Sequence, residues 1–278
     1  MAISFPDGAW TGGRSGNEVY KVAYYMNVGL RDGQEDCIFV NGSVFQEKKF
    51  EAVAVQDLGK ELLLFAVCDG MGGHAKGEWA SRFVCEKLKE NYRDLRFSRD
   101  STELLVEKIQ NQIENEMVSD SGTTIAGVVL EEGRAHIFNV GDSRVYKITK
   151  GGIFYMSHDH SLVQSSVDHG DISPDEAFAH PYKNVIEFGI GDVFRNEWAK
   201  GGKAVHITED LLGADEWYLV CSDGVNDVMR DQEIYAILRD DPFGGLSAFV
   251  GSLEERMKDN FSFILVAGEE AGQGSGCA

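Results

Sequence analysis

Cysteine and proline are scarce in this sequence of 278 residues. Its four prolines form no proline-rich linker that would divide the chain, and its five cysteines show no CxxC spacing. An odd cysteine count without that spacing argues against a disulfide framework or a structural zinc site. Cys37, Cys68, Cys85 and Cys221 lie in or beside apolar segments, so we expect them to be buried thiols in a reducing compartment, the cytoplasm.

Long apolar runs and basic residues are also lacking. No run approaches the roughly 18 apolar residues of a membrane helix, and the first ten residues, MAISFPDGAW, lack the regions of a secretory signal. The 26 basic and 46 acidic residues give a net charge of −20. Since affinity for a phosphate backbone depends on Lys and Arg, this balance disfavours nucleic acid as a partner. Most of the acids are interpreted as a solvated surface.

The periodicity of apolar residues indicates helices first and a strand meander after them. Residues 76–92 are predicted to be a helix, and a second helix follows Asp100, where Asp-Ser-Thr-Glu fits a capping box. Short β-rich runs with connections of a few residues come next, and such connections join antiparallel strands. This order predicts an α+β fold with an antiparallel core and helices outside it. Further elements are expected as a short helix after Ser173-Pro174, strands at "EWYLVCS" and "FSFILVAG", and helices near 231–239 and 246–257.

The stretch Gly70-Met71-Gly72-Gly73-His74-Ala75 fits the dinucleotide pattern G-x-G-x-x-A after an apolar run. That pattern needs a βαβ unit with an acidic residue at the end of the next strand. Here one helix is followed by a loop and another helix, so the nucleotide interpretation is not favoured. A phosphate-binding P-loop fails as well, because Glu78 stands where its lysine is required.

Acidic residues recur at the ends of apolar strands. One alone is explained as a turn, because Asp-Gly is a favoured turn pair. Several at converging strand ends would repel one another unless cations lie between them, and ligand sets of oxygen alone select Mg²⁺ or Mn²⁺ over zinc. The acids concerned are Glu35, Asp36, Asp69, Asp142, Asp223 and Asp259.

Eight segments occur in the order found in one family: "RDGQED", "CDGMGGHAKGE", "SGTT", "VGDSR", "DHSLVQ", "HPYKN", "SDGVND" and "DNFS". The sequence thereby resembles the metal-dependent PP2C-type serine/threonine phosphatases, the PPM family, in their compact bacterial branch. The resemblance covers roughly residues 20–267. It implies a four-layer αββα sandwich, two antiparallel sheets flanked by helices. We expect an N-terminal extension at 1–20, one phosphatase domain at 21–268, and a flexible tail at 269–278.

The resemblance also implies a metal site. Asp69 would bridge two Mn²⁺ or Mg²⁺ ions, with the Gly70 carbonyl as a further ligand. A hydroxide between the ions would then attack phosphorus in line. The remaining implied ligands are Asp223 and Asp259 for one ion, Glu35 and Asp36 for the other, and Asp142, with Asp223, for a third.

Two further residues match groups that act on the substrate in this family. Arg31 matches the phosphate-binding arginine, and a guanidinium suits two phosphate oxygens. His74 matches the proton donor to the leaving oxygen. Each has a plainer alternative: Arg31 as a surface arginine, His74 as a residue that stabilises its glycine-rich loop, and Asp142 as one that stabilises a hairpin.

The sequence therefore predicts a monomeric, cytoplasmic protein serine/threonine phosphatase that acts on phosphoproteins without a phosphoenzyme. No cysteine of the four above begins a C-x₅-R nucleophile motif. The alternatives are an inactive sensor of the same fold and a hydrolase of small phosphoesters. Two segments depart from the pattern or are unexplained: Glu187-Phe188, where relatives usually have Thr-Arg, and an insertion at 43–61.

Overall fold

The structure is a computed structural model that describes residues 19–59, 61–72, 75–201 and 205–268. Two antiparallel sheets form its centre. The first has the strand order β10 (Gly152–Tyr155), β9 (Arg144–Thr149), β13 (Trp217–Cys221), β14 (Phe261–Ala267), β1 (Val19–Asn27) and β4 (Ala54–Gly59). The second has the order β11 (Ile190–Gly191), β6 (Gly122–Thr123), β5 (Leu63–Met71), β7 (Ile125–Glu131), β8 (Arg134–Val140) and β12 (His206–Leu211). In the second sheet, β5 also pairs with β2 (Asp36–Val40), and β2 pairs in turn with β3 (Ser43–Phe45).

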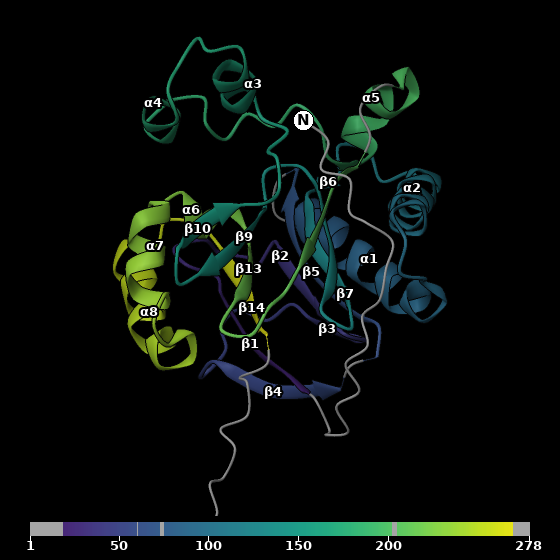
Figure 1. Cartoon of the computed structure of the whole chain (residues 1–278). Helices are drawn as coiled ribbons and strands as arrows, with labels where there is room; N and C mark the ends of the chain where they lie inside the picture. Colours follow the sequence, from purple (N-terminus) through teal and green to yellow (C-terminus); the bar gives the residue numbers. More distant parts are fainter. Residues whose placement is uncertain (1–18, 60, 73–74, 202–204, 269–278) are drawn as a thin grey trace, which may run out of the picture.

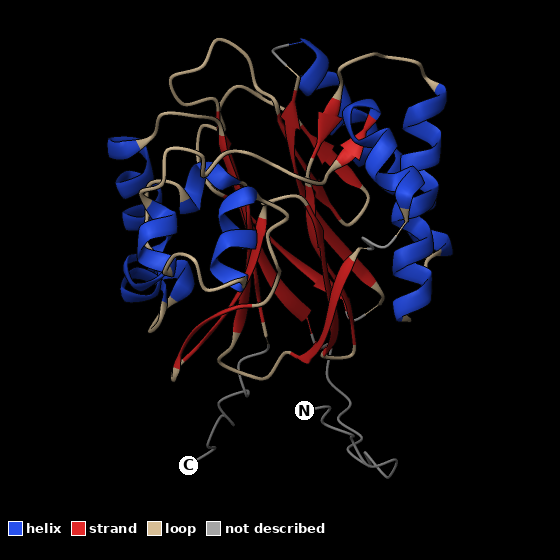
Figure 2. Cartoon of the chain, turned by 90° about the horizontal axis from the view of Figure 1, so that it is seen from above, coloured by secondary structure: helices blue, strands red, loops and turns tan. Residues whose placement is uncertain are grey.

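The two sheets face each other, and helices cover both outer faces (Figures 1 and 2). Apolar side chains such as Val67, Ile137 and Val220 fill the space between the sheets. Helices α1 (Ala75–Asn91) and α2 (Arg99–Asn115) pack on the second sheet, and α7 (Asp231–Leu238) and α8 (Pro242–Arg256) pack on the first. Because each sheet buries one face against its partner and the other against helices, the strands carry continuous apolar runs. The predicted α+β sandwich is confirmed.

The predicted elements are present, with two boundaries corrected. The cap of α2 is Ser98, whose hydroxyl accepts a hydrogen bond from the Ser101 backbone, so the helix begins before the capping box expected at Asp100. Helix α8 begins at Pro242, four residues before the expected 246, because Asp241 caps it and proline is favoured in the first turn. Short helices complete the chain: α3 (Leu162–Asp168), α4 (Pro174–Phe178), α5 (Arg195–Lys200) and α6 (Asp223–Asn226), with 3₁₀ turns at Tyr92–Asp94 and Asp192–Phe194.

The insertion at 43–61 supplies sheet structure. Its second half forms β4, which pairs with β1 at the edge of the first sheet, with Val19 opposite Gly59. Alternate residues of β4 are exposed. The half-buried aromatic rings of Phe45 and Phe50 pack on the core between the sheets. The four cysteines named above are buried free thiols, as predicted.

The pairing register brings one end of the strands together. Asp36 at the start of β2 lies opposite Asp69 near the end of β5. In the facing sheet, Cys221 at the end of β13 lies opposite Phe263 near the start of β14. In an antiparallel pair the end of one strand meets the start of its neighbour at the same edge of the sheet. The acidic residues beside these positions therefore collect at one end of the sandwich.

Two histidines, one buried and one half-buried, predict how stability responds to acid. Burial lowers the pKa of His136 on β8 and of His206 on β12 below the usual 6.5. Since the unfolded chain then binds more protons than the folded one, stability is fully present above about pH 6.5 and is lost as pH falls below it. The test is the difference between wild type and His136→Gln in thermal melts from pH 8 to pH 5: relative to the variant, the wild-type protein should lose stability as the pH falls, because only the wild type has this histidine to protonate. A difference that does not change with pH would contradict the assignment.

Candidate active site

Hydrogen bonds to Thr123 and Thr124, which follow α2 in the chain, hold the backbone of Asp69 in place. Its backbone N–H donates to the Thr124 hydroxyl at 3.1 Å, and its carbonyl accepts from the Thr123 hydroxyl and the Thr124 N–H, each at 2.9 Å. Thr123 and Thr124 are fully buried. The "SGTT" segment thus holds the backbone of Asp69, which leaves its carboxyl group to extend from the strand end.

Asp36 is joined to the facing sheet through a serine. The Ser222 hydroxyl donates to Asp36 Oδ2 at 2.8 Å and accepts the Ser262 backbone N–H at 3.0 Å. Ser222 directly precedes Asp223, and Ser262 lies three residues after Asp259. This bridge therefore fixes the distance between the pair Asp36–Asp69 on one sheet and the pair Asp223–Asp259 on the other.

The carboxyl groups of this cluster lie close enough to perturb one another. Burial, followed by the charges of Asp223 and Asp259, raises the pKa of Asp36. Burial and then the charge of Asp223 also raise the pKa of both Asp69 and Asp142. The repulsion within such a cluster is relieved either by bound protons or by cations between the carboxylates.

Three observations test whether these residues fit a divalent ion. Asp36 Oδ1 and Asp142 Oδ1 are buried and accept no hydrogen bond from the part of the chain that the structure describes. An added Cβ at Gly70 would overlap the Gly77 carbonyl and lie 2.7 Å from the Glu35 carbonyl, so only glycine allows the backbone segments beside the cluster to pack this closely. The donors are all oxygen atoms, which hard cations such as Mg²⁺ and Mn²⁺ prefer. The residues fit these ions.

The acidic side chains of the cluster do not converge on one point. Among the described residues, no three His, Cys, Asp or Glu side chains are arranged so that they could hold a metal ion. Burial and the charge of Asp223 raise the pKa of Asp69, so a cation placed between the two carboxyl groups would relieve their repulsion.

Arg31 lies at the rim, on the loop between β1 and β2. Its guanidinium pairs with the Asp259 carboxylate and its side chain is 48% exposed, so donors remain free for a phosphate. Asn260, which the sequence analysis did not single out, fixes this loop. Its amide donates to the Val28 and Gly33 carbonyls at 2.8 and 3.0 Å, and its Oδ1 accepts the Glu35 N–H at 2.6 Å.

Two other positions differ from the sequence-based list. Asp227, at the end of α6, was missed: its charge raises the pKa of both Asp142 and Asp223 after burial does, and it forms an ion pair of 2.8 Å with Lys183. Its position four residues after Asp223, one helical turn away, was the available signal. The predicted proton donor His74 lies outside the described residues.

Known proteins similar to this chain belong to one family. A family model described as protein phosphatase 2C matches residues 46–258. The chain belongs to the protein phosphatase 2C family. It is 27% identical over 221 residues to the serine/threonine phosphatase stp of Listeria monocytogenes, a match that covers 76% of this chain and 79% of stp. It is 32% identical over 185 residues to the serine/threonine protein phosphatase PstP of Mycobacterium tuberculosis, covering 63% of this chain and 34% of the longer PstP.

Solved structures confirm the fold that this family predicts. The crystal structure of Mycobacterium tuberculosis PstP aligns with a TM-score of 0.72 at 25% identity, covering 91% of this chain and 100% of that one. The family model includes Asp69, Asp142 and Asp223, whereas Arg31, Glu35 and Asp36 precede it and Asp259 follows it. The roles of individual residues stay predictions.

Proposed function

We propose that this protein, a serine/threonine phosphatase of the 2C type, hydrolyses phosphoserine and phosphothreonine in proteins at the end of the sandwich that holds Asp36, Asp69 and Asp223. The observation that carries the proposal is this cluster of carboxyl groups with raised pKa at the facing ends of both sheets, of which Asp36 is fully buried and Asp69 and Asp223 are half-buried. The proposal includes two divalent ions held by this cluster and a third ion bound near Asp142. Divalent cations bound there would activate water as the nucleophile and offset the charge of the phosphate.

The protein residues have separate tasks in this proposal. Asp69 and Asp223 hold the ions from facing sheets, with Glu35, Asp36, Asp259 and the Gly70 carbonyl as further ligands. Arg31 binds phosphate oxygens, because its guanidinium offers several donors in one plane. His74 donates a proton to the leaving oxygen. Thr124, Ser222 and Asn260 position these groups through their hydrogen bonds.

The decisive test is phosphopeptide hydrolysis with Mn²⁺, without metal, and after addition of EDTA. Release of phosphate that requires Mn²⁺ and stops with EDTA would support the proposal. A protein that binds Mn²⁺ but releases no phosphate would instead be a sensor of the same fold. Faster hydrolysis of small phosphoesters than of any phosphopeptide would favour the metabolite hydrolase.

Asp142→Ala separates a metal ligand from a turn residue. Asp142 is 6% exposed and its Oδ1 accepts no hydrogen bond from the described chain. Because burial and neighbouring acids disfavour the charged Asp142 carboxyl, its loss should not lower the free energy of unfolding by more than about 0.5 kcal/mol. Turnover should fall and its dependence on millimolar Mn²⁺ should flatten. A lower melting temperature with normal kcat and an unchanged metal titration would show a structural role.

Membrane insertion receives no support from the described helices, none of which is long and apolar enough to span a bilayer. Three expectations of the sequence analysis remain predictions: a monomer, a cytoplasmic location, and the absence of nucleic-acid binding. So do the boundaries of the domain at 21 and 268, although β1 already begins at Val19.

A further inference from the structure

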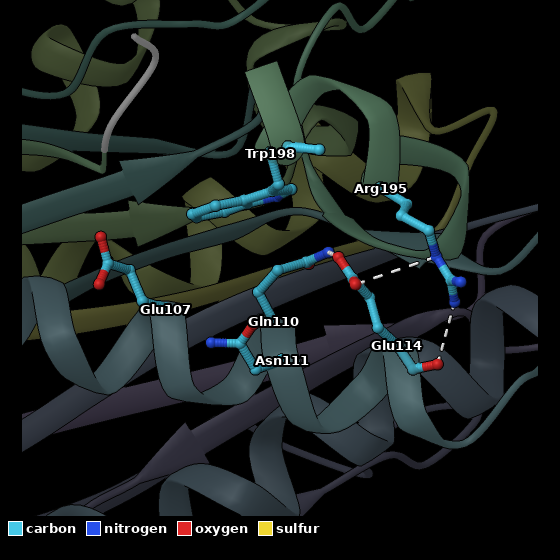
Figure 3. Close-up of a pocket in the computed structure, with 7 residues that line it drawn as sticks. Glu107, Gln110, Asn111, Glu114, Arg195 and Trp198 are labelled. Carbon is cyan, nitrogen blue, oxygen red and sulfur yellow. Dashed lines mark hydrogen bonds and ion pairs between the residues drawn. The ribbon is translucent and has the colours of Figure 1, made fainter. Parts of the chain in front are cut away.

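A pocket lies between α2 and α5, separate from the carboxylate cluster (Figure 3). Its volume is about 240 Å³, the size of one long side chain rather than of a drug-sized ligand. Helix α2 contributes Glu107, Gln110, Asn111 and Glu114 to the lining, and the segment of α5 contributes Arg195, Trp198 and Ala199. Figure 3 shows Trp198 across the pocket from the side chains of α2.

The charges of the pocket favour a cation. Arg195, its one positive lining residue, is already bound by Asp192 at 2.9 Å, by the Glu114 carbonyl at 3.0 Å and by the Glu114 carboxylate at 3.9 Å. Gln110 Nε2 also donates to Glu114 at 2.6 Å. Glu107, by contrast, makes no hydrogen bond or ion pair with another described residue, and it is exposed. The Glu107 carboxylate of the pocket therefore has no partner in the described part of the chain.

The opposite wall is a fixed aromatic ring. Trp198 Nε1 donates to the Gly189 carbonyl at 2.8 Å, and its ring packs on Phe188 with centroids 4.8 Å apart. Phe188 is fully buried. The burial of Phe188 thus fixes the position of the Trp198 ring. A cation between an indole face and a carboxylate gains from both.

The pocket is connected to the end of β5 by two strand pairings. Gln110 Oε1 accepts the Gly191 N–H at 2.8 Å, Gly191 on β11 pairs with Gly122 on β6, and Gly122 pairs with Met71, two residues after Asp69. Two interstrand spacings span about 10 Å, and the helix contact brings the total to roughly 15 Å. An extended peptide covers that distance in about four to six residues.

We propose that the pocket between α2 and α5 binds a lysine or arginine side chain of the phosphoprotein substrate, about four to six residues from the phosphorylated serine or threonine. This rests on the proposed function. Glu107 pairs with the cationic group, Asn111 offers a hydrogen bond beside it, and the ring of Trp198 covers the aliphatic stem. The pocket thus sets substrate preference without contact with the reacting phosphate.

The test uses phosphoserine peptides of one neutral sequence, in which a single lysine is moved through positions three to seven on each side. With Mn²⁺, one or two placements four to six residues away should raise kcat/KM roughly three- to ten-fold over the peptide without lysine, the range for one exposed ion pair with a cation–π contact. Glu107→Gln should remove this gain. Hydrolysis of p-nitrophenyl phosphate, which cannot reach the pocket, should stay unchanged in the variant.

Glu103→Gln is the matched control, one turn earlier on α2 and outside the pocket lining, and it should keep the preference. Equal kcat/KM for all lysine placements in the wild-type protein would overturn the inference, as would a preference that survives Glu107→Gln. In both cases the peptides are still hydrolysed. Failure of the proposed function is distinct, because then no peptide releases phosphate at all.

Discussion

Asp69→Asn is expected to lower kcat with Mn²⁺ at least about 100-fold, because activation of water depends on the ions that this residue would hold from the end of β5. The neutral amide cannot balance their charge. Folding should survive, since the Thr123 and Thr124 hydrogen bonds go to the backbone of Asp69 and not to its side chain. Retention of more than about a tenth of wild-type kcat would end the metal hypothesis.

Melting curves provide a readout that does not depend on activity. Mn²⁺ at 100 times its Kd should stabilise the wild-type protein by about 2.7 kcal/mol, because it binds the folded state alone. Asp69→Asn should lose most of this shift while melting normally without metal. Asp57→Asn, on the exposed edge strand β4, is the control and should keep both the shift and the activity. A full Mn²⁺ shift in Asp69→Asn would place the ion elsewhere.

Gly70→Ala is expected to damage the same site through the backbone. Its Cβ would overlap the Gly77 carbonyl at the start of α1 and lie 2.7 Å from the Glu35 carbonyl. Backbone atoms held by a helix and a strand cannot yield as a flexible side chain does, so we expect a loss of about 1–3 kcal/mol in stability. Displacement of Glu35 and of the Gly70 carbonyl should also weaken Mn²⁺ binding and turnover together.

Gly59→Ala provides the comparison at a glycine with space around it. A Cβ at Gly59 meets no atom within 4 Å, and the residue lies on the exposed edge strand β4. Stability and Mn²⁺ titration should therefore remain close to wild type. If Gly70→Ala behaved like Gly59→Ala in both measurements, close approach of the backbone at Gly70 would not be a requirement of the site.

The helices and strands followed from local pattern because their apolar residues repeat with the right period. "LLLFAVCDG" and "EWYLVCSDG" predicted buried strands with an acid at the end; Asp69 lies two residues before the end of β5, and Asp223 lies two residues after the end of β13. Errors occurred where local chemistry offered equivalent choices. Ser98 and Asp100 are both good caps, and in the structure the Ser98 hydroxyl accepts the Ser101 N–H at the start of α2. The strand β4 was missed, since an edge strand exposes alternate residues and shows no continuous apolar run.

The sequence by itself determined the chemistry of the site: oxygen ligands at strand ends, an arginine before them, and a glycine-rich loop at residues 70–73. It also determined the resemblance to a family, through the order of its motifs. What only the tertiary structure decided is which of these groups meet. Asn260, Ser222 and Asp227 lie within the quoted segments "DNFS" and "SDGVND", yet their roles depend on partners up to 232 residues away, such as Val28 for Asn260. The pocket beside Trp198 arises in the same way, because α2 and α5 are separated in sequence and are joined by the hydrogen bond from Arg195 to the Glu114 carbonyl.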